Sequence, residues 1–238
     1  LESNNLGKVD AVKREILDLY HADFKKIDSS GRASMLFDAI PGQLNNNAMR
    51  YQVSSVNEST RATQILELIA EMVDSGTVNI AYHANDPSVG FAMHKDLEVF
   101  KLYLCDTGLF VTLAFWDKNF TDNLLYQKLL NDKMSTDLGY VYENVVAQML
   151  VAKGNSLFYH TFKSETSHHN HEIDFLLSRD GKICPVEVKS STYKRHASFD
   201  AFCTKFSSRI LHKYLIYTKD LRKEKDVLYL PTYMTPFL

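Results

Sequence analysis

The sequence lacks several features that assign a protein to a class at once. Its longest apolar run, Leu109 to Trp116, is far shorter than the roughly 18 residues that a membrane-spanning helix needs. No basic-then-apolar signal segment opens the chain, and it contains no internal repeat. We therefore expect no membrane partner. The chain begins at Leu1 rather than at a methionine, which predicts a piece of a longer protein.

Cysteine is scarce and excess positive charge is absent. The three cysteines, at positions 105, 184 and 203, show no CxxC spacing, which favours reduced thiols in a cytoplasmic protein over a disulfide framework or a zinc ribbon. A net charge of −2 excludes a strongly basic nucleic-acid binder. With 238 residues, 45% of them hydrophobic, the chain can form one large domain or two small ones.

The near-neutral balance hides two regions of opposite charge. Residues 1–138 hold 13 basic and 19 acidic residues, for a net charge of −6. Residues 139–238 hold 14 basic and 10 acidic residues, for a net charge of +4, together with six of the nine histidines. This difference indicates two modules.

The first region is predicted to be mainly helical. Apolar spacing predicts helices over 8–26, 33–40 (ended by Pro41-Gly42) and 60–75, followed by strands over 78–83 and 100–104. This order predicts a winged-helix-like domain over residues 31–125, after a helical segment at 1–30. Cations are few between Asn45 and Asp86, so we favour a packing or linker role over DNA binding.

The second region, residues 126–238, is predicted to be a small α/β module. The expected helices are 136–152 and 198–206, and the expected strands are 157–162, 172–178, 183–190, 211–217 and 227–230. The whole chain is thus predicted to be α/β (α+β), with the helical domain first.

Asp180-Gly181 is a strong signal for a two-residue hairpin turn. Such a turn predicts that Asp174 lies opposite Glu187 and that Glu172 lies opposite Lys189, with the intervening apolar residues on the other face. Two facing carboxylates repel, and a divalent cation held by oxygens would offset that repulsion. The alternative is a ladder of surface salt bridges, which the Asp174–Glu187 pair does not fit.

A third acidic residue, Glu143, falls on the predicted helix 136–152. Its neighbours at helical spacing include Val146, Ala147 and Leu150, so the carboxylate lies in an apolar stripe and is expected to point at the sheet. The alternative is a glutamate at the rim of the helix that reaches solvent.

This order of a helix Glu143, a strand Asp174 and a strand Glu187-Val188-Lys189 resembles the PD-(D/E)XK nuclease superfamily. The resemblance implies a restriction-endonuclease-like α/β domain over 126–238. One departure is Ile173, which stands where the pattern has a proline before the aspartate, a proline that many members also lack.

Longer segments resemble the C-terminal half of a prokaryotic AAA-type ATPase family whose tail is called domain of unknown function 4143. The segments are Tyr20–Lys25, Ile40–Leu44, Phe100–Leu109, Glu172–Phe175 and Glu187–Ser191. The resemblance implies an ATPase module upstream of this chain. Because the sequence has no GxxxxGK[ST] motif, ATP is expected to act only through that upstream module.

The resemblance also implies roles for individual residues. Asp174 and Glu187 would hold Mg²⁺ or Mn²⁺, and Glu143 would bind a second metal or a metal-bound water. Lys189 would orient the attacking water during phosphodiester hydrolysis. Lys194 and Arg195 would contact nucleic-acid phosphates, with Lys205 or Arg209 as further candidates.

Three hypotheses about function follow. The first is a metal-dependent nuclease tethered to an ATPase, and the intact Asp174, Glu187 and Lys189 favour it. The second is a module that binds nucleic acid or a partner protein without cutting, which the weak positive charge favours. The third is a structural role as a lid and oligomer contact for the ATPase.

We interpret the histidines of Ser167–His171 as part of a polar loop rather than a metal site.

Overall fold

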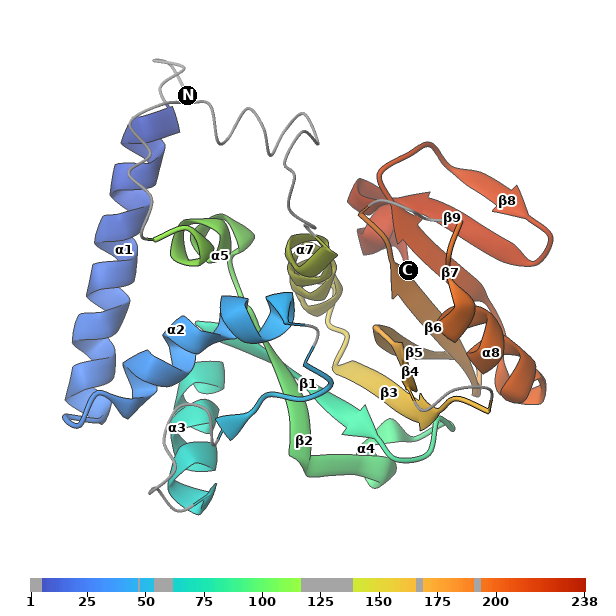
Figure 1. Cartoon of the computed structure of the whole chain (residues 1–238), viewed down its shortest axis with the longest axis horizontal. Coiled ribbons are helices and arrows are strands. Elements are labelled where there is room, and N and C mark those ends of the chain that lie inside the picture. Colours follow the sequence, from blue (N-terminus) through green and yellow to red (C-terminus); the bar gives the residue numbers. More distant parts are fainter. Residues whose placement is uncertain (1–5, 47, 54–61, 117–138, 166–168, 191–193) are drawn as a thin grey trace. The chain divides into compact units, whose positions relative to one another are not determined.

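The computed structural model describes residues 6–46, 48–53, 62–116, 139–165, 169–190 and 194–238 (Figure 1). The chain forms two compact units that alternate along the sequence. The first, here called the helical unit, comprises Leu1–Ala48, Gln52–Val78 and Leu104–Val141. The second, the sheet unit, comprises Met49–Tyr51, Asn79–Tyr103 and Tyr142–Leu238. The predicted mixed α/β class is confirmed, and the domain limits at residues 30 and 125 stay predictions.

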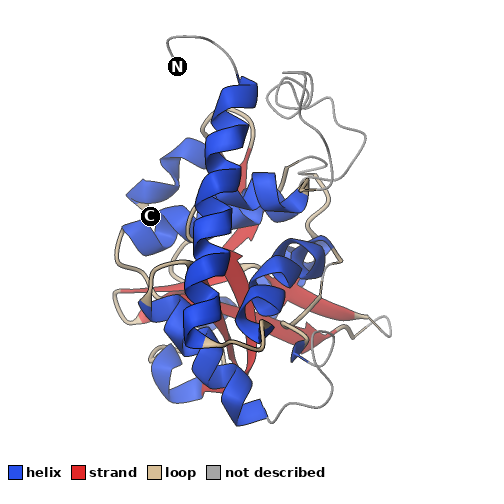
Figure 2. Cartoon of the chain, turned by 90° about the vertical axis from the view of Figure 1, so that its left-hand side faces the viewer, coloured by secondary structure: helices blue, strands red, loops and turns tan. Residues whose placement is uncertain are grey.

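Among its described residues, the helical unit contains the long helix at the front of Figure 2 and three shorter ones. The helices are α1 (Leu6–Ile27), α2 (Arg32–Asn45), α3 (Ala62–Asp74) and α5 (Thr107–Ala114). Buried Phe24 of α1 packs on buried Phe37 of α2 with a ring separation of 5.2 Å. The helices predicted at 8–26 and 60–75 are confirmed. Helix α5 was not predicted, although the Asp106 carboxylate caps it by accepting a hydrogen bond from the Leu109 N–H at 3.0 Å.

The prediction that Pro41-Gly42 ends the second helix is wrong, because α2 continues to Asn45. A proline inside a helix removes one backbone hydrogen bond and is usually costly. Here Ile40, Pro41 and Leu44 are all buried, so the extra turn contributes apolar burial that offsets the missing bond. The local signal was real, and tertiary packing overrode it.

The sheet unit contains nearly all of the β-structure. Its strands are β1 (Val78–Ala84), β2 (Lys95–Leu104), β3 (Leu157–Lys163), β4 (Asn170–Ile173), β5 (Phe175–Arg179), β6 (Lys182–Val188), β7 (Lys213–Tyr217), β8 (Arg222–Glu224) and β9 (Val227–Pro231). Its helices are α4 (Phe91–His94), α7 (Gly139–Ala152) and α8 (Ala197–Lys205), with 3-10 turns at Ser207–Arg209 and Thr232–Phe237. The first residues of the predicted helix 136–152 lie outside the described residues.

The strands form two sheets. The first has the order β2-β1-β3-β4, in which β1 and β3 run parallel and β4 is antiparallel to β3. The second has the order β5-β6-β7-β9-β8, in which β6, β7 and β9 run parallel and the two outer strands are antiparallel to their neighbours. Helix α8 packs against both sheets, since its buried Phe199 and Phe202 share one core cluster with Phe158 of β3, Ile173 of β4 and Ile183 of β6.

The predicted hairpin is present, with its turn at Asp180-Gly181. Both turn residues have positive φ, 48° and 72°, as a tight hairpin turn of this type requires. The register is also as predicted, from Arg179 opposite Lys182 to Phe175 opposite Val186.

The predicted strand 172–178 is interrupted at Asp174, and the pairing fails there. Before the interruption, β4 pairs with β3, so that Glu172 lies opposite Thr161 rather than Lys189. Asp174 lies between the two strands and is not a ladder partner of Glu187. Ile173 and Leu176 belong to the same core cluster, although regular alternation would send residues three apart to opposite faces. The chain therefore bends at Asp174.

Candidate functional site

The end of β6 supplies two of the predicted site residues. Glu187 is 3% exposed. The ammonium Nζ of Lys189 lies 2.7 Å from the Glu187 Oε1, so the two side chains form an ion pair. The backbone N–H of Lys189 donates to the Ile216 carbonyl at 2.8 Å, which fixes the residue beside β7. The sequence predicted that Lys189 faces Glu172, and this is wrong. Lys189 pairs with Glu187 instead.

Asp174 contacts the same end of β6 from the bend between β4 and β5. Asp174 is 8% exposed, and its Oδ2 accepts a hydrogen bond from the Val188 N–H at 2.7 Å. The Asp174 side chain thus bonds to the residue after Glu187, beyond the last backbone pair of β5 and β6. Asp174, Glu187 and Lys189 thus lie together at the end of β6, through a geometry that differs from the predicted ladder, and their role as a site stays a prediction.

Helix α7 supplies Glu143. Val146, Ala147 and Leu150, its predicted neighbours on one helix face, are fully buried. Burial, and then the neighbouring charge of Asp174, raise the pKa of Glu143 to about 8. The same two causes, in the same order, raise the pKa of Glu187 to about 8. Glu143 therefore interacts electrostatically with both acidic residues of the predicted set.

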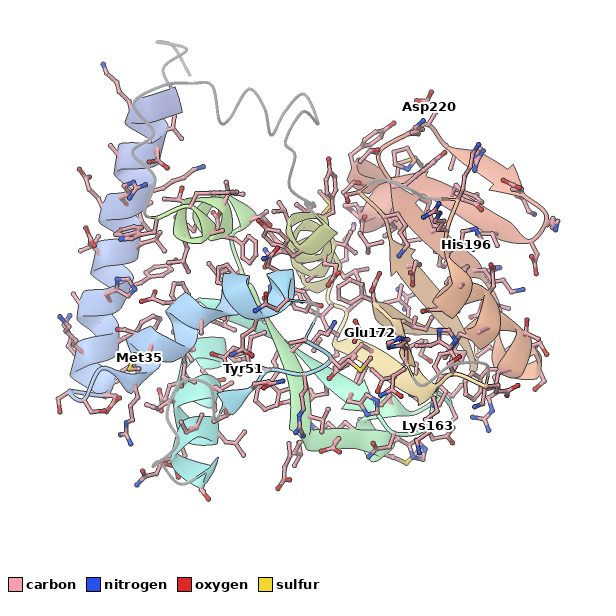
Figure 3. The ribbon with its side chains drawn as sticks, viewed as in Figure 1. Met35, Tyr51, Lys163, Glu172, His196 and Asp220 are labelled. Carbon is pink, nitrogen blue, oxygen red and sulfur yellow. The ribbon has the colours of Figure 1, made fainter. Side chains whose placement is uncertain are left out.

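Two residues that were not predicted as site residues lie beside the predicted set. Lys101, on β2, is 4% exposed and forms an ion pair with Glu172 on β4, which is labelled in Figure 3. Burial lowers the pKa of Lys101, but Glu172, Glu143 and Asp174 outweigh that effect and hold the pKa above its usual value. A lone cation between Phe100 and Leu102 in an apolar strand was the available signal, because a buried charge needs a partner.

We call Glu143, Glu172, Asp174 and Glu187 the acidic cluster. Three buried polar atoms beside it have no hydrogen-bond partner among the described residues, namely the Tyr103 hydroxyl, Glu172 Oε2 and Glu187 Oε2. The charges of Glu143, Glu172 and Asp174 raise the pKa of Tyr103 further above the level that burial alone sets. Unpaired buried oxygens beside like charges are costly, so these atoms need an explanation beyond packing.

The donor chemistry fits Mg²⁺ or Mn²⁺, which prefer carboxylate oxygens. The side-chain arrangement fits less closely, because no three Asp, Glu, His or Cys side chains within the described ranges are gathered into a metal-binding set. The Glu187 Oε1 is already paired with Lys189. Holding a metal would therefore require these carboxylates to turn toward one another.

The predicted phosphate contacts differ in their surroundings: two are exposed, and two contact other side chains. Lys194 and Arg195 are exposed and follow the undescribed residues 191–193. Arg209 forms an ion pair with Asp86, which leaves it less suited to a phosphate. Lys205 lies 5.4 Å from the ring centre of Phe162 and lines a pocket of about 280 Å³ with Phe162, Lys163 and His171. In the predicted polar loop, residues 166–168 lie outside the described residues.

Two family models match the chain. Residues 138–233 match a domain of unknown function (DUF4143), and this range includes every predicted site residue. Residues 2–119 match a second domain of unknown function (DUF8612), which includes Lys101 and Tyr103. No curated protein and no solved structure matches the chain. Among the described helices, none is both long and apolar enough to cross a membrane.

Proposed function

We propose that the sheet unit is a divalent-metal-dependent phosphodiesterase of the nuclease type. The observation that carries this proposal is the buried set formed by Glu143, Asp174 and Glu187, with the ammonium of Lys189 paired to one of its carboxylates. Acidic oxygens with an adjacent lysine are the groups that metal-assisted phosphodiester hydrolysis uses. The order of these residues along the chain, and their resemblance to the PD-(D/E)XK pattern, also support it.

Asp174, Glu187 and Glu143 would hold Mg²⁺ or Mn²⁺, which would polarise the phosphoryl oxygen and acidify a bound water. Residues of the chain would stabilise charge on the phosphate, orient the water and position the carboxylates. Because Lys189 stays protonated beside Glu187, its ammonium would stabilise negative charge on the scissile phosphate and orient the attacking water. Asp174 is held by the Val188 N–H, so the position of its carboxylate is fixed before substrate arrives.

The proposed substrate is nucleic acid, with Lys194 and Arg195 as phosphate contacts. We propose further that the chain is the C-terminal part of an AAA-type ATPase, that residues 31–125 form a winged-helix-like packing domain, and that ATP acts through an upstream module. The match to DUF4143 over residues 138–233 supports only the part of this proposal that concerns the tail domain.

A cleavage assay tests the proposed activity. End-labelled single-stranded, duplex and branched DNA and RNA would be incubated with the chain in Mg²⁺, Mn²⁺ or EDTA. Metal-dependent cutting that Asp174→Asn and Lys189→Ala both abolish supports the proposal. Cutting that survives in either variant places the activity elsewhere or in a contaminant. Asp180→Asn, in the exposed turn of the same hairpin, is the matched control.

A second candidate function is a module that binds nucleic acid or a partner protein without cutting. The observation that favours it is the pairing of both lysines with carboxylates, together with the lack of a gathered metal-binding set in the described part of the chain. This candidate predicts no cleavage under any metal condition and, for nucleic acid, binding that weakens steeply with salt.

A further inference from the structure

A pocket of about 280 Å³ lies where β3 and β4 meet α8, and the proposed function does not use it. Its lining includes an aromatic ring, two ammonium groups, an imidazole, a carboxylate and a hydroxyl group. The residues that supply these groups are Phe162, Lys163, Lys205, His171, Glu165 and Thr204. All of them belong to the sheet unit, so the pocket is formed within one compact part of the chain.

The pocket lies on the opposite face of the first sheet from the ion pair between Lys101 and Glu172. Successive residues of a strand point to opposite faces, so His171 faces away from its neighbour Glu172. On the side of His171, Phe162 packs against the core cluster that includes Phe202 of α8. The sheet would therefore separate a ligand in the pocket from this ion pair, and the inference below does not depend on the acidic cluster.

Contacts with the rest of the sheet unit hold the two rings of the pocket in place. Phe162 and His171 are direct partners in the antiparallel ladder of β3 and β4, and their ring centres lie 5.1 Å apart. The ring of Phe162 also lies 5.9 Å from that of the fully buried Phe202. The Nδ1 of His171 and the Oγ of Ser198 lie 3.0 Å apart and share a hydrogen bond, which ties the imidazole to α8. The pocket is therefore largely formed before a ligand arrives.

Two lysines give the pocket an excess of positive charge. Lys205, at the end of α8, has its Nζ 5.4 Å from the ring centre of Phe162 and 5.8 Å from that of Phe206. Lys163, labelled in Figure 3, is exposed at the end of β3. Neither lysine forms an ion pair with any acidic residue that the structure describes. Two ammonium groups thus stand against the single carboxylate of Glu165, and this balance favours an anionic ligand.

An aromatic ring beside unpaired ammonium groups is a combination with which proteins hold the base and the phosphate of a nucleotide. Pockets for drug-sized molecules begin at about 300 Å³, so this one has room for a small ligand and not for a helix or a duplex. We infer that the pocket binds a nucleoside monophosphate group, with its phosphate on Lys163 and Lys205 and its base against the half-buried ring of Phe162. A free nucleotide and the phosphorylated end of a nucleic-acid strand both carry this group, and the test separates the two.

The test is isothermal titration calorimetry of the 238-residue chain in EDTA, which removes metal binding and cleavage from the measurement. AMP should bind at one equivalent, and adenosine and inorganic phosphate should each bind at least about tenfold more weakly, because each lacks one half of the recognised group. Lys205→Met and Lys163→Met should each weaken AMP binding about tenfold, since a charge-assisted contact is lost. Phe162→Leu should weaken the binding of AMP but not that of phosphate. Lys182→Met, at an exposed lysine at the start of β6, is the matched control and should bind AMP normally.

A second titration identifies the source of the group. A single-stranded hexanucleotide with a 5′-phosphate that binds more tightly than its 5′-hydroxyl counterpart identifies a strand end, whereas tight binding of AMP alone identifies a free nucleotide. No binding of AMP, phosphate that binds as tightly as AMP, or unchanged AMP binding in both lysine variants overturns the inference and leaves the proposed nuclease standing. Circular dichroism checks folding, and the two lysine variants carry the test if Phe162→Leu is unfolded.

Discussion

The Asp174 carboxylate accepts a hydrogen bond from the Val188 N–H at 2.7 Å, and this bond holds a bend in one strand against the end of the next. The backbone ladder between β5 and β6 ends at the pair Phe175 and Val186, so Asp174 lies one residue and Val188 two residues beyond the last pair. The Asp174 side chain therefore makes the contact with β6 that a backbone hydrogen bond would make in a regular ladder. The bend directs Asp174 toward Glu187 and Lys189, and so creates the candidate site.

Replacing Asp174 with asparagine should stabilise the metal-free protein. The charge of Asp174 raises the pKa of both Glu143 and Glu187, which shows that the like charges repel. Asparagine removes that repulsion while its carbonyl can still accept from Val188. Urea unfolding in EDTA at pH 7.5 should show a free energy of unfolding higher by about 1 kcal/mol. Equal or lower stability than the unchanged chain would contradict a repulsive cluster, with Asp180→Asn as the control.

Replacing Lys189 with methionine should separate metal binding from catalysis. Methionine keeps the aliphatic stem but removes the ammonium paired with Glu187. Cleavage should fall at least about 100-fold, since a positioned charge and proton donor is lost. Mn²⁺ binding should persist, because all the carboxylates remain. Lys153→Met, at an exposed position in the turn directly after α7, should cut normally. Loss of Mn²⁺ binding in Lys189→Met would instead assign the lysine to holding the carboxylates in place.

Replacing Tyr103 with phenylalanine should also raise stability in the absence of metal. The Tyr103 hydroxyl is buried and has no hydrogen-bond partner among the described residues, so it loses its hydration on folding without compensation. Thermal unfolding in EDTA should give a gain of about 1 kcal/mol. A loss of similar size would mean that the hydroxyl has a partner in solution, such as a bound water.

Stability should fall with acid through His160. Burial lowers the pKa of His160 to about 4, while its Nδ1 lies 2.7 Å from the Ala84 carbonyl oxygen and donates to it. Because the folded pKa lies below the unfolded value of about 6.5, the neutral ring is favoured on folding. Its contribution is complete above pH 6.5 and is lost as the pH falls toward 4, by up to about 3 kcal/mol. His160→Asn, which keeps a donor toward Ala84, should show a shallower loss between these pH values. Parallel curves would contradict the prediction.

Local signals in the sequence were sufficient for most of the secondary structure. The turn at Asp180-Gly181 was predicted with its register, because two residues with positive φ leave only one way to pair the flanking strands. The apolar face beside Glu143 was likewise correct, since helical periodicity depends on spacing alone.

What the sequence could not provide depends on contacts between distant segments. The bend falls at Asp174, inside the segment 172–178 that the sequence predicts to be one continuous strand. Lys101 and Glu172 meet only because β1 and β3 lie side by side and bring β2 and β4 into one sheet. The burial of Pro41 likewise depends on the tertiary packing of α2 and not on the local sequence.

The most direct test of a metal site in the acidic cluster is anomalous diffraction from crystals of the chain grown with Mn²⁺. A metal site here should give one anomalous peak bounded by carboxylate oxygens of Asp174, Glu187 and Glu143, at about 2 Å from the coordinating atoms. Lys101 should remain paired with Glu172. Crystals that contain Mn²⁺ but show no peak there, with Lys189 still paired to Glu187, would contradict the metal site and favour a module that does not cut.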